Sequence, residues 1–284
     1  MDTSRLQAAV LAAKASASEL GLAAEDTLVL HNSNRIAVRL LPCDLLARVA
    51  PASTHGADAG FELEVARLLA EAGAPCGGPD HRVAPRTYDQ DGFAITFWTY
   101  YEPVSPEVPP ANFARALYHL HAGLRNIELP TPHFTDRIAE AQTLVEDPLL
   151  TPELGNADRK FLANALRTLR TAVLQRGAPE QLLHGEPHPG NLLNTKHGPL
   201  FIDLQTACRG PVEFDIAHAP EAVAAHYPGL DEDLVADCRL LVLAMVAAWR
   251  WDRNDQFPQG RQMGIDLLRQ LRSAAPRFGL DTNA

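Results

Sequence analysis

Lysine is scarce in this chain of 284 residues, since only three of the 25 basic residues are lysines: Lys14, Lys160 and Lys196. The 35 acidic residues give a formal net charge of −10. Broad binding to nucleic acid requires a basic face, so we expect no nucleic-acid partner. An acidic surface is compatible with a cationic small-molecule partner, although it most often serves solubility alone.

Paired cysteines and long apolar runs are also missing. The four cysteines are far apart and form no CxxC pair, which argues against a disulfide framework and favours a reducing cytoplasm. The longest apolar run, Leu240–Trp249, is too short for a bilayer, which needs about 20 residues. The N-terminal segment leads into an Ala-rich amphipathic stretch rather than a signal peptide. We therefore expect a cytoplasmic protein without a membrane partner.

Hydrophobic patterning divides the chain into two parts at a Pro-rich segment, residues 103–110. The first part predicts a helix over 4–20, an antiparallel meander over 27–50, a loop over 53–60, a helix from 61 to 72 and a strand over 93–101. The second part predicts a hairpin within 191–204 and helices over 111–125, 135–147, 156–176, 214–226, 230–252 and 261–274. The sequence thus predicts an α+β protein with a small sheet lobe, 1–103, and a larger mainly helical lobe, 104–284.

The segment His184–Asn191 has the composition of a shaped loop, because two prolines and two glycines exclude a regular helix. It exposes an acid, Glu186, and an amide, Asn191, and the following hairpin returns a second acid, Asp203. Mg²⁺ prefers oxygen ligands, takes only one or two carboxylates and fills its other positions with phosphate oxygens and water. The pattern therefore favours magnesium–phosphate chemistry.

The residues of this loop have two other interpretations. A zinc site on His184 and His188 is excluded, because histidines four residues apart converge only on a helix and Pro187 and Pro189 prevent one. The other interpretation is an ordinary loop with buried histidines, and the return of Asp203 beside Asn191 argues against it.

At this point the chain resembles a known family. The run His184–Asn191 is similar to the His-Gly-Asp-x-x-x-x-Asn loop of the aminoglycoside phosphotransferase and choline-kinase-like family, which shares the protein-kinase fold. Phe201–Asp203 resembles the metal aspartate of that family, and Gly210–Ala217 resembles its Gly-Asp-Pro-x-x-Asp-Leu-Ala segment. The resemblance implies a bilobal kinase-like fold, with Glu186 as catalytic base and Asn191 and Asp203 as metal ligands.

The resemblance assigns further roles in both lobes. In the second lobe, His184, His188 and Asp215 support the loop. In the first, Glu62 is the ion-pair glutamate of a helix that ends Gly-x-Pro, with Glu64 as the fallback. The residues expected at the adenine site are Phe97, Trp98, Thr99 and Tyr100. Plain strand core remains the alternative for them, and a solvated surface acid is the alternative for either glutamate.

Four positions depart from the family pattern. Arg48 stands where the phosphate-binding lysine is expected, and Arg and Lys are not interchangeable. Glu186 replaces the usual aspartate, which displaces the carboxylate by about one bond length. The loop 31–35 lacks glycines, so that polar groups, Asn34 among them, must cover the phosphates. Gln205 stands where an acid is common.

The resemblance implies an ATP- and Mg²⁺-dependent kinase that transfers the γ-phosphoryl group to a hydroxyl of a small molecule, with GTP as the alternative donor. An aminoglycoside or other antibiotic is one acceptor class, and an amino alcohol or a ketosamine is another. The alternative function is a catalytically impaired, pseudokinase-like protein that binds nucleotide. Acids near Trp249 and Trp251 would suit a cationic acceptor. The alternative is that they are helix caps, since acids are common at helix starts. The acids in question are Glu221, Asp231, Glu232, Asp233, Asp237, Asp252 and Asp255.

Overall fold

The computed structural model describes residues 3–32, 35–104, 107–274 and 276, without the side chains of 53–58. The chain separates into two compact units. One comprises Met1–Glu128 and Pro189–Ala207, and the other comprises Leu129–His188 and Cys208–Ala284. This division differs from lobes that meet at residue 103, because the first unit includes the helix after the Pro-rich segment and a later excursion of the chain. Lobes bounded at 103 stay a prediction.

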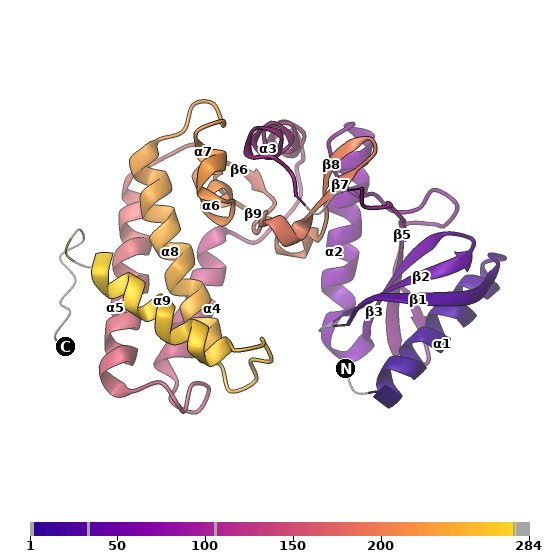
Figure 1. Ribbon diagram of the computed structural model, residues 1–284, viewed down its shortest axis with the longest axis horizontal. Coiled ribbons are helices and arrows are strands. Elements are labelled where there is room, and N and C mark those ends of the chain that lie inside the picture. Colours follow the sequence, from indigo (N-terminus) through magenta and orange to yellow (C-terminus); the bar gives the residue numbers. More distant parts are fainter. Residues whose placement is uncertain (1–2, 33–34, 105–106, 275, 277–284) are drawn as a thin grey trace. The chain divides into compact units, whose positions relative to one another are not determined.

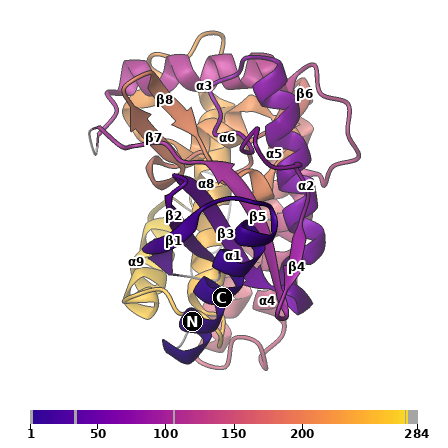
Figure 2. The same cartoon turned by 90° about the vertical axis from the view of Figure 1, so that its right-hand side faces the viewer.

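The first unit is built on a five-stranded antiparallel sheet of order β1-β2-β3-β5-β4 (Figure 1). The strands are β1 (Ala24–Asn32), β2 (Ile36–Pro42), β3 (Leu45–Pro51), β4 (Tyr88–Gln90) and β5 (Phe93–Thr99). Helix α1 (Thr3–Glu19) covers one face with small buried side chains, and Figure 2 shows it in front of the strands. The expected antiparallel meander is confirmed.

Helices and a hairpin complete the first unit. Helix α2 (Ala52–Glu71) contacts β3 and β5, and helix α3 (Pro110–Leu124) contacts β8. The returning segment forms a 3-10 turn η1 (Pro189–Asn191), the hairpin β7 (Leu192–Thr195) and β8 (Gly198–Phe201), and a second turn η2 (Leu204–Thr206). Phe201 exchanges backbone hydrogen bonds with Pro75 and Gly77, which ties the hairpin to the chain that follows α2.

The second unit is mainly helical around an apolar core that includes Phe134, Phe161, Phe214 and Met245. Its helices are α4 (Phe134–Glu146), α5 (Asn156–Gln175), α6 (Val212–His218), α7 (Glu221–Ala224), α8 (Glu232–Arg250) and α9 (Gly260–Ala274). A two-stranded antiparallel pair, β6 (Glu180–Leu183) and β9 (Cys208–Pro211), packs against them (Figure 1). The segment that forms η1, β7, β8 and η2 lies between β6 and β9 in the chain, so the strand pair brings the two ends of that segment together.

Two expectations about elements are wrong. Residues 53–60 are helical, because α2 begins at Ala52, directly after β3; small residues gave no apolar stripe there, but a helix nucleated downstream propagates backwards at low cost. The helix expected over 214–226 is broken into α6 and α7 at Pro220, which cannot continue a helix. The short strands β4, β6 and β9 were not predicted as elements.

All four cysteines are free. Within the described residues, no helix has the length and apolar character that crossing a bilayer requires. The small antiparallel sheet and the helical remainder confirm the α+β class.

Candidate functional site

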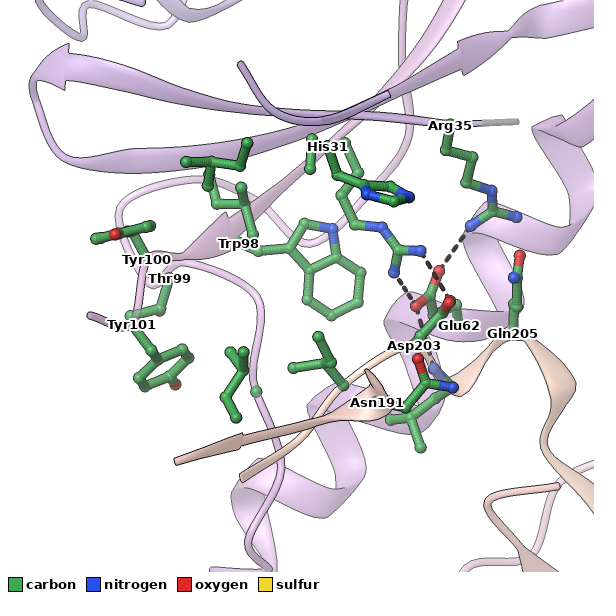
Figure 3. Close-up of a pocket in the computed structure, with 18 of the residues that line it drawn as sticks. His31, Arg35, Glu62, Trp98, Thr99, Tyr100, Tyr101, Asn191, Asp203 and Gln205 are labelled. Carbon is green, nitrogen blue, oxygen red and sulfur yellow. Dashed lines mark hydrogen bonds and ion pairs between the residues drawn. The ribbon is translucent and has the colours of Figure 1, made fainter. Parts of the chain in front are cut away.

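A cavity of about 690 Å³ lies within the first unit, between the sheet, α2 and the β7–β8 segment (Figure 3). One end is aromatic and apolar, with Trp98 and Tyr100 and the backbone that follows β5. The other end is charged and polar, with Glu62, Asn191 and Asp203. A cavity with one apolar and one charged end suits a ligand that joins a flat ring to an anionic chain.

Glu62 and Asp203 are joined by Arg48 at the charged end. From β3, the Arg48 guanidinium donates through Nη1 to the Glu62 carboxylate and through Nη2 to Oδ1 of Asp203 at 2.8 Å. Oε1 of Glu62 also accepts a hydrogen bond from the backbone N–H of Leu204 at 3.2 Å. The fork geometry of arginine allows one side chain to hold two carboxylates at once. The ion pair expected between Arg48 and Glu62 is present.

Burial and ion pairing shift the pKa values of Glu62 and Arg48 in opposite directions. The Glu62 side chain is only 1% exposed. Burial raises the pKa of the Glu62 carboxyl, and attraction to Arg48 and Arg35 opposes that rise. Burial acts to lower the pKa of Arg48, but attraction to Glu62 and Asp203 outweighs it, and this pKa is raised. The fallback residue, Glu64, instead pairs at the surface with Arg67.

Arg35 is a cation of the cavity to which the sequence assigned no contact. It precedes β2, and its Nη1 donates to Oε2 of Glu62 at 2.8 Å. Glu62 therefore binds two guanidiniums, Arg35 and Arg48, which both line the cavity. The sequence signal was the position of Arg35 at the end of the polar loop; its partner on α2 is a tertiary contact. Asn34 of that loop lies outside the described residues.

Asn191 and Asp203 lie together at the charged end, at the two ends of the β7–β8 hairpin (Figure 3). The hairpin register brings these ends together, and Ile202 N–H donates to the carbonyl of Asn191 at 3.0 Å. Asp203 has a φ of 67°, a left-handed conformation that Asp tolerates better than most residues. No group of three or more His, Cys, Asp or Glu side chains suited to a metal is found in the part of the chain that the structure describes.

The donor set nevertheless fits Mg²⁺. This ion requires only one or two protein carboxylates when phosphate oxygens and water fill the remaining positions. Asn191 and Asp203 supply an amide and a carboxylate oxygen, and the Asp203 side chain is 29% exposed and within reach of the cavity. We conclude that these two residues could hold a hard divalent cation on a bound polyphosphate.

Within strand β5, Trp98 faces the cavity and Phe97 faces the core on the other side of the sheet. Trp98 lines the cavity, and its indole N–H donates to the Thr96 hydroxyl at 2.8 Å. Thr99 and Tyr100 also line the cavity. Phe97 points to the opposite face, where it packs in the core against Tyr88, and it does not line the cavity. Its expected contact with the nucleotide is corrected by the period-2 alternation of a strand.

Glu186 and its loop belong to the second unit, where the loop follows β6. Asp215 on α6 is fully buried and accepts from the backbone N–H groups of His184, at 2.9 Å, and Gly185, at 2.8 Å. Gly185 has a φ of 89°, which glycine adopts without strain. The backbone N–H of Glu186 donates to Nδ1 of the buried His184 at 3.3 Å. Asp215 and His184 therefore hold the loop, in the supporting positions expected for them.

The Glu186 carboxylate, 27% exposed, pairs with Arg137 of α4 at 3.4 Å. The backbone carbonyl of Glu186 accepts from the N–H of His188 at 2.8 Å, which closes the turn before Pro189. Nothing in the sequence indicates that Arg137 contacts the loop, because a single arginine in an amphipathic helix is ordinary.

The acids of the second unit are largely engaged within the protein. Asp231 caps α8 by accepting from the N–H of Leu234, and Asp231, Asp233 and Asp237 all lie within 4 Å of Arg176. Asp255 pairs with Arg250 at 3.2 Å. The interpretation of these acids as caps and ion-pair partners describes them better than a cluster kept for a cationic acceptor.

Comparisons with known proteins agree with this geometry. A family model described as "Phosphotransferase enzyme family" matches residues 28–253. No protein among curated sequences matches significantly. Among solved structures, the amicoumacin kinase hAmiN in complex with AMP-PNP, Ca²⁺ and Ami aligns with a TM-score of 0.71 at 12% identity, covering 99% of each chain.

Two further structures align over most of their length. A choline/ethanolamine kinase family protein from Mesorhizobium loti gives a TM-score of 0.67 at 17% identity and covers 95% of each chain. The GDP and kanamycin complex of APH(2")-IIia gives 0.65 at 16% identity, covering 89% of this chain and 95% of that one. These alignments confirm the kinase-like fold.

Proposed function

Since this chain belongs to the phosphotransferase enzyme family, as the match over residues 28–253 shows, we propose that it is a nucleotide- and Mg²⁺-dependent kinase of a small-molecule alcohol. The observation that carries the proposal is the charged end of the cavity, where Arg48, Glu62, Asn191 and Asp203 meet. The kinase neighbours that hold AMP-PNP with Ca²⁺, or GDP with kanamycin, support the use of a nucleotide and a divalent cation.

The nucleotide is proposed to bind along the length of the cavity. Its base lies among Ile36, Leu46 and Leu193 beside the backbone at Thr99–Tyr101, and ATP and GTP are both candidates. Its phosphates lie at the charged end, against Arg48 and Arg35. Glu62 keeps both guanidiniums in place before the ligand arrives, so that little rearrangement is needed on binding.

Asn191 and Asp203 would hold the Mg²⁺, which when bound neutralises phosphate charge. Arg48 contacts Asp203. That pairing orients the carboxylate, and we expect Arg48 to shift toward the phosphates when the nucleotide binds.

Glu186 is proposed to orient the acceptor hydroxyl and take its proton. The acceptor oxygen forms a bond to the γ-phosphorus while the bond from phosphorus to the bridging oxygen of the nucleoside diphosphate breaks, and the proton passes to the carboxylate. Because the transition state of phosphoryl transfer is loose, positioning and charge neutralisation contribute more than the base. A glutamate is therefore compatible with turnover.

The test is turnover of purified protein with ATP or GTP and Mg²⁺ over a panel of alcohols that includes amino sugars, amino alcohols and ketosamines. We expect nucleoside diphosphate and a phosphorylated product with at least one acceptor. Glu186→Gln should lower kcat by about 10²-fold, as expected for a general base. Asp203→Asn should lower turnover and weaken the response to Mg²⁺.

Glu64→Gln is the matched control, because Glu64 lies on the same helix as Glu62 but pairs only with surface Arg67. It should retain wild-type turnover. Equal turnover in wild type, Glu186→Gln and Asp203→Asn would refute the site assignment. Thermal stabilisation by nucleotide without turnover of any acceptor would instead assign the chain to nucleotide binding alone.

A further inference from the structure

We propose that Arg137, on the first turn of α4, is a positioning residue that holds the Glu186 carboxylate in its working orientation. The inference rests on the proposed function, because it assigns a partner to the proposed base. It concerns a contact made entirely within the second unit. Neither the sequence pattern nor the family match assigns a role to this arginine.

Arg137 binds both the backbone and the side chain of the loop. Its Nη1 donates to the carbonyl of Gly185 at 3.3 Å, and its Nη2 donates to Oε2 of Glu186 at 3.4 Å. A guanidinium presents several donors in one rigid plane, so a single residue can fix the carboxylate relative to the preceding peptide. A lysine ammonium on a flexible stem would fix it less well.

The guanidinium is itself held from the other side. Its Cζ lies 4.9 Å from the ring centroid of Trp249 on α8, a cation–π arrangement. The Arg137 side chain is 17% exposed, so water screens the contact only in part. Three elements, α4, α8 and the loop after β6, therefore meet at this one cation.

The first turn of α4 is a rigid platform. His133 and Asp136 form a reciprocal capping box, in which the His133 side chain accepts from the backbone of the first turn and Asp136 accepts from the His133 N–H. His133 also contacts Glu180 at the start of β6 through Nε2 at 3.1 Å. Arg209 on β9 donates its backbone N–H to the carbonyl of Pro132 at 2.8 Å.

The strand pair β6–β9 contacts the start of α4 and also leads into the loop. Because β6 runs directly into His184 and Glu186, the same two strands position both Glu186 and Arg137. A glutamate has one more rotatable bond than an aspartate, and fixing such a side chain costs conformational entropy. Arg137 supplies the restraint that the longer acid requires.

The experiment compares wild type with Arg137→Ala, Arg137→Lys and the control Arg167→Ala, at saturating nucleotide and over a range of acceptor concentrations. Arg167 pairs with Glu146 on the surface, so its removal deletes a guanidinium away from the loop. We expect Arg137→Ala to lower kcat about 10-fold to 100-fold, as displacement of a reacting group does. The nucleotide KM should change by less than about twofold, whereas Arg137→Lys should recover part of the loss. Added guanidinium ion should partly rescue Arg137→Ala.

A double variant distinguishes a positioning role of Arg137 from a general disturbance of the fold. In the Glu186→Gln background, Arg137→Ala should cause little further loss of kcat, because both changes disable the same group. If the wild type is active and Arg137→Ala matches Arg167→Ala, the inference is overturned while the proposed function stands. Full additivity in the double variant also overturns it. A wild type without turnover overturns the proposed function, and the inference falls with it.

Discussion

Glu62 shows how one buried carboxylate organises the charged end of the cavity. It binds Arg35 and Arg48 and the backbone N–H of Leu204, whereas Glu64, two residues further along the same helix, meets only surface Arg67. The two glutamates are close in sequence but differ in every contact. Their comparison therefore measures the combined effect of burial and of pairing with two guanidiniums.

We expect Glu62→Gln to destabilise the fold by about 3–5 kcal/mol, because the neutral amide removes the buried negative charge that pairs with both Arg35 and Arg48. Glu64→Gln should change stability by less than about 1 kcal/mol, as exposed pairs do. Denaturant unfolding of both variants measures the difference. Equal midpoints and equal slopes for the two would contradict the assignment of Glu62 as the anchor.

Asn191 and Asp203 were predicted to lie close together because they stand at the two ends of one hairpin. The pairing of Arg48 with Glu62 was instead implied by the resemblance to the phosphotransferase family. Phe97 was assigned to the site because the whole strand is apolar, so alternation could not tell its two faces apart. Arg35 and Arg137 act through partners that sequence spacing does not reveal.

At the scale of elements, α4 packs tightly against β9. A Cβ added at Gly210 would lie 2.9 Å from Cδ1 of Phe134 and 3.1 Å from Cδ1 of Leu183. Gly60 on α2 is the opposite case, since a Cβ there would meet nothing within 4 Å. Neither glycine has a positive φ, so the backbone conformation at both positions is open to alanine.

Gly210→Ala should destabilise the protein by about 1–3 kcal/mol through overpacking, and should lower kcat as α4 shifts from the loop. Gly60→Ala should stabilise it by about 0.5–1 kcal/mol, because alanine is the better helix former. Thermal unfolding and turnover of both variants provide the measurement. A neutral Gly210→Ala would mean that α4 is not tightly packed on β9.

The long helices and the β7–β8 hairpin followed from the sequence, whereas the pairing of the short strands β6 and β9 did not. Helices such as α5 and α8 present apolar stripes over several turns, which gives a strong periodic signal. The strands β6 and β9 have four residues each and pair across an intervening excursion, so their pairing depends on tertiary structure. The helical start of α2 was missed because small residues carry no stripe.

Acid stability of the whole molecule should depend on one histidine. The half-buried His218 at the end of α6 has a pKa lowered to about 3, first because its ring is shielded from water and then because Arg137 repels a second positive charge. In the described part of the chain its Nε2 is buried without a hydrogen-bond partner. The ordinary value of 6.5 applies in the unfolded chain.

Between these two pKa values the unfolded chain holds a proton at His218 that the folded chain does not. Stability should therefore fall as the pH is lowered from about 6.5 toward about 3, by up to about 1.4 kcal/mol per pH unit. His218→Gln should flatten this part of the profile in denaturant titrations from pH 7 to pH 4. The control His226→Gln, which replaces an exposed histidine, should follow wild type. Parallel profiles for all three proteins would contradict the role of His218.

The chain passes from one unit to the other between His188 and Pro189, three residues after Glu186 and two before Asn191. Five peptide links join the Cα atoms of these two residues. A fully extended tether of that length reaches at most roughly 18 Å. Covalent geometry thus sets an upper limit on the distance between Glu186, the proposed proton acceptor, and Asn191, the proposed amide ligand of the metal.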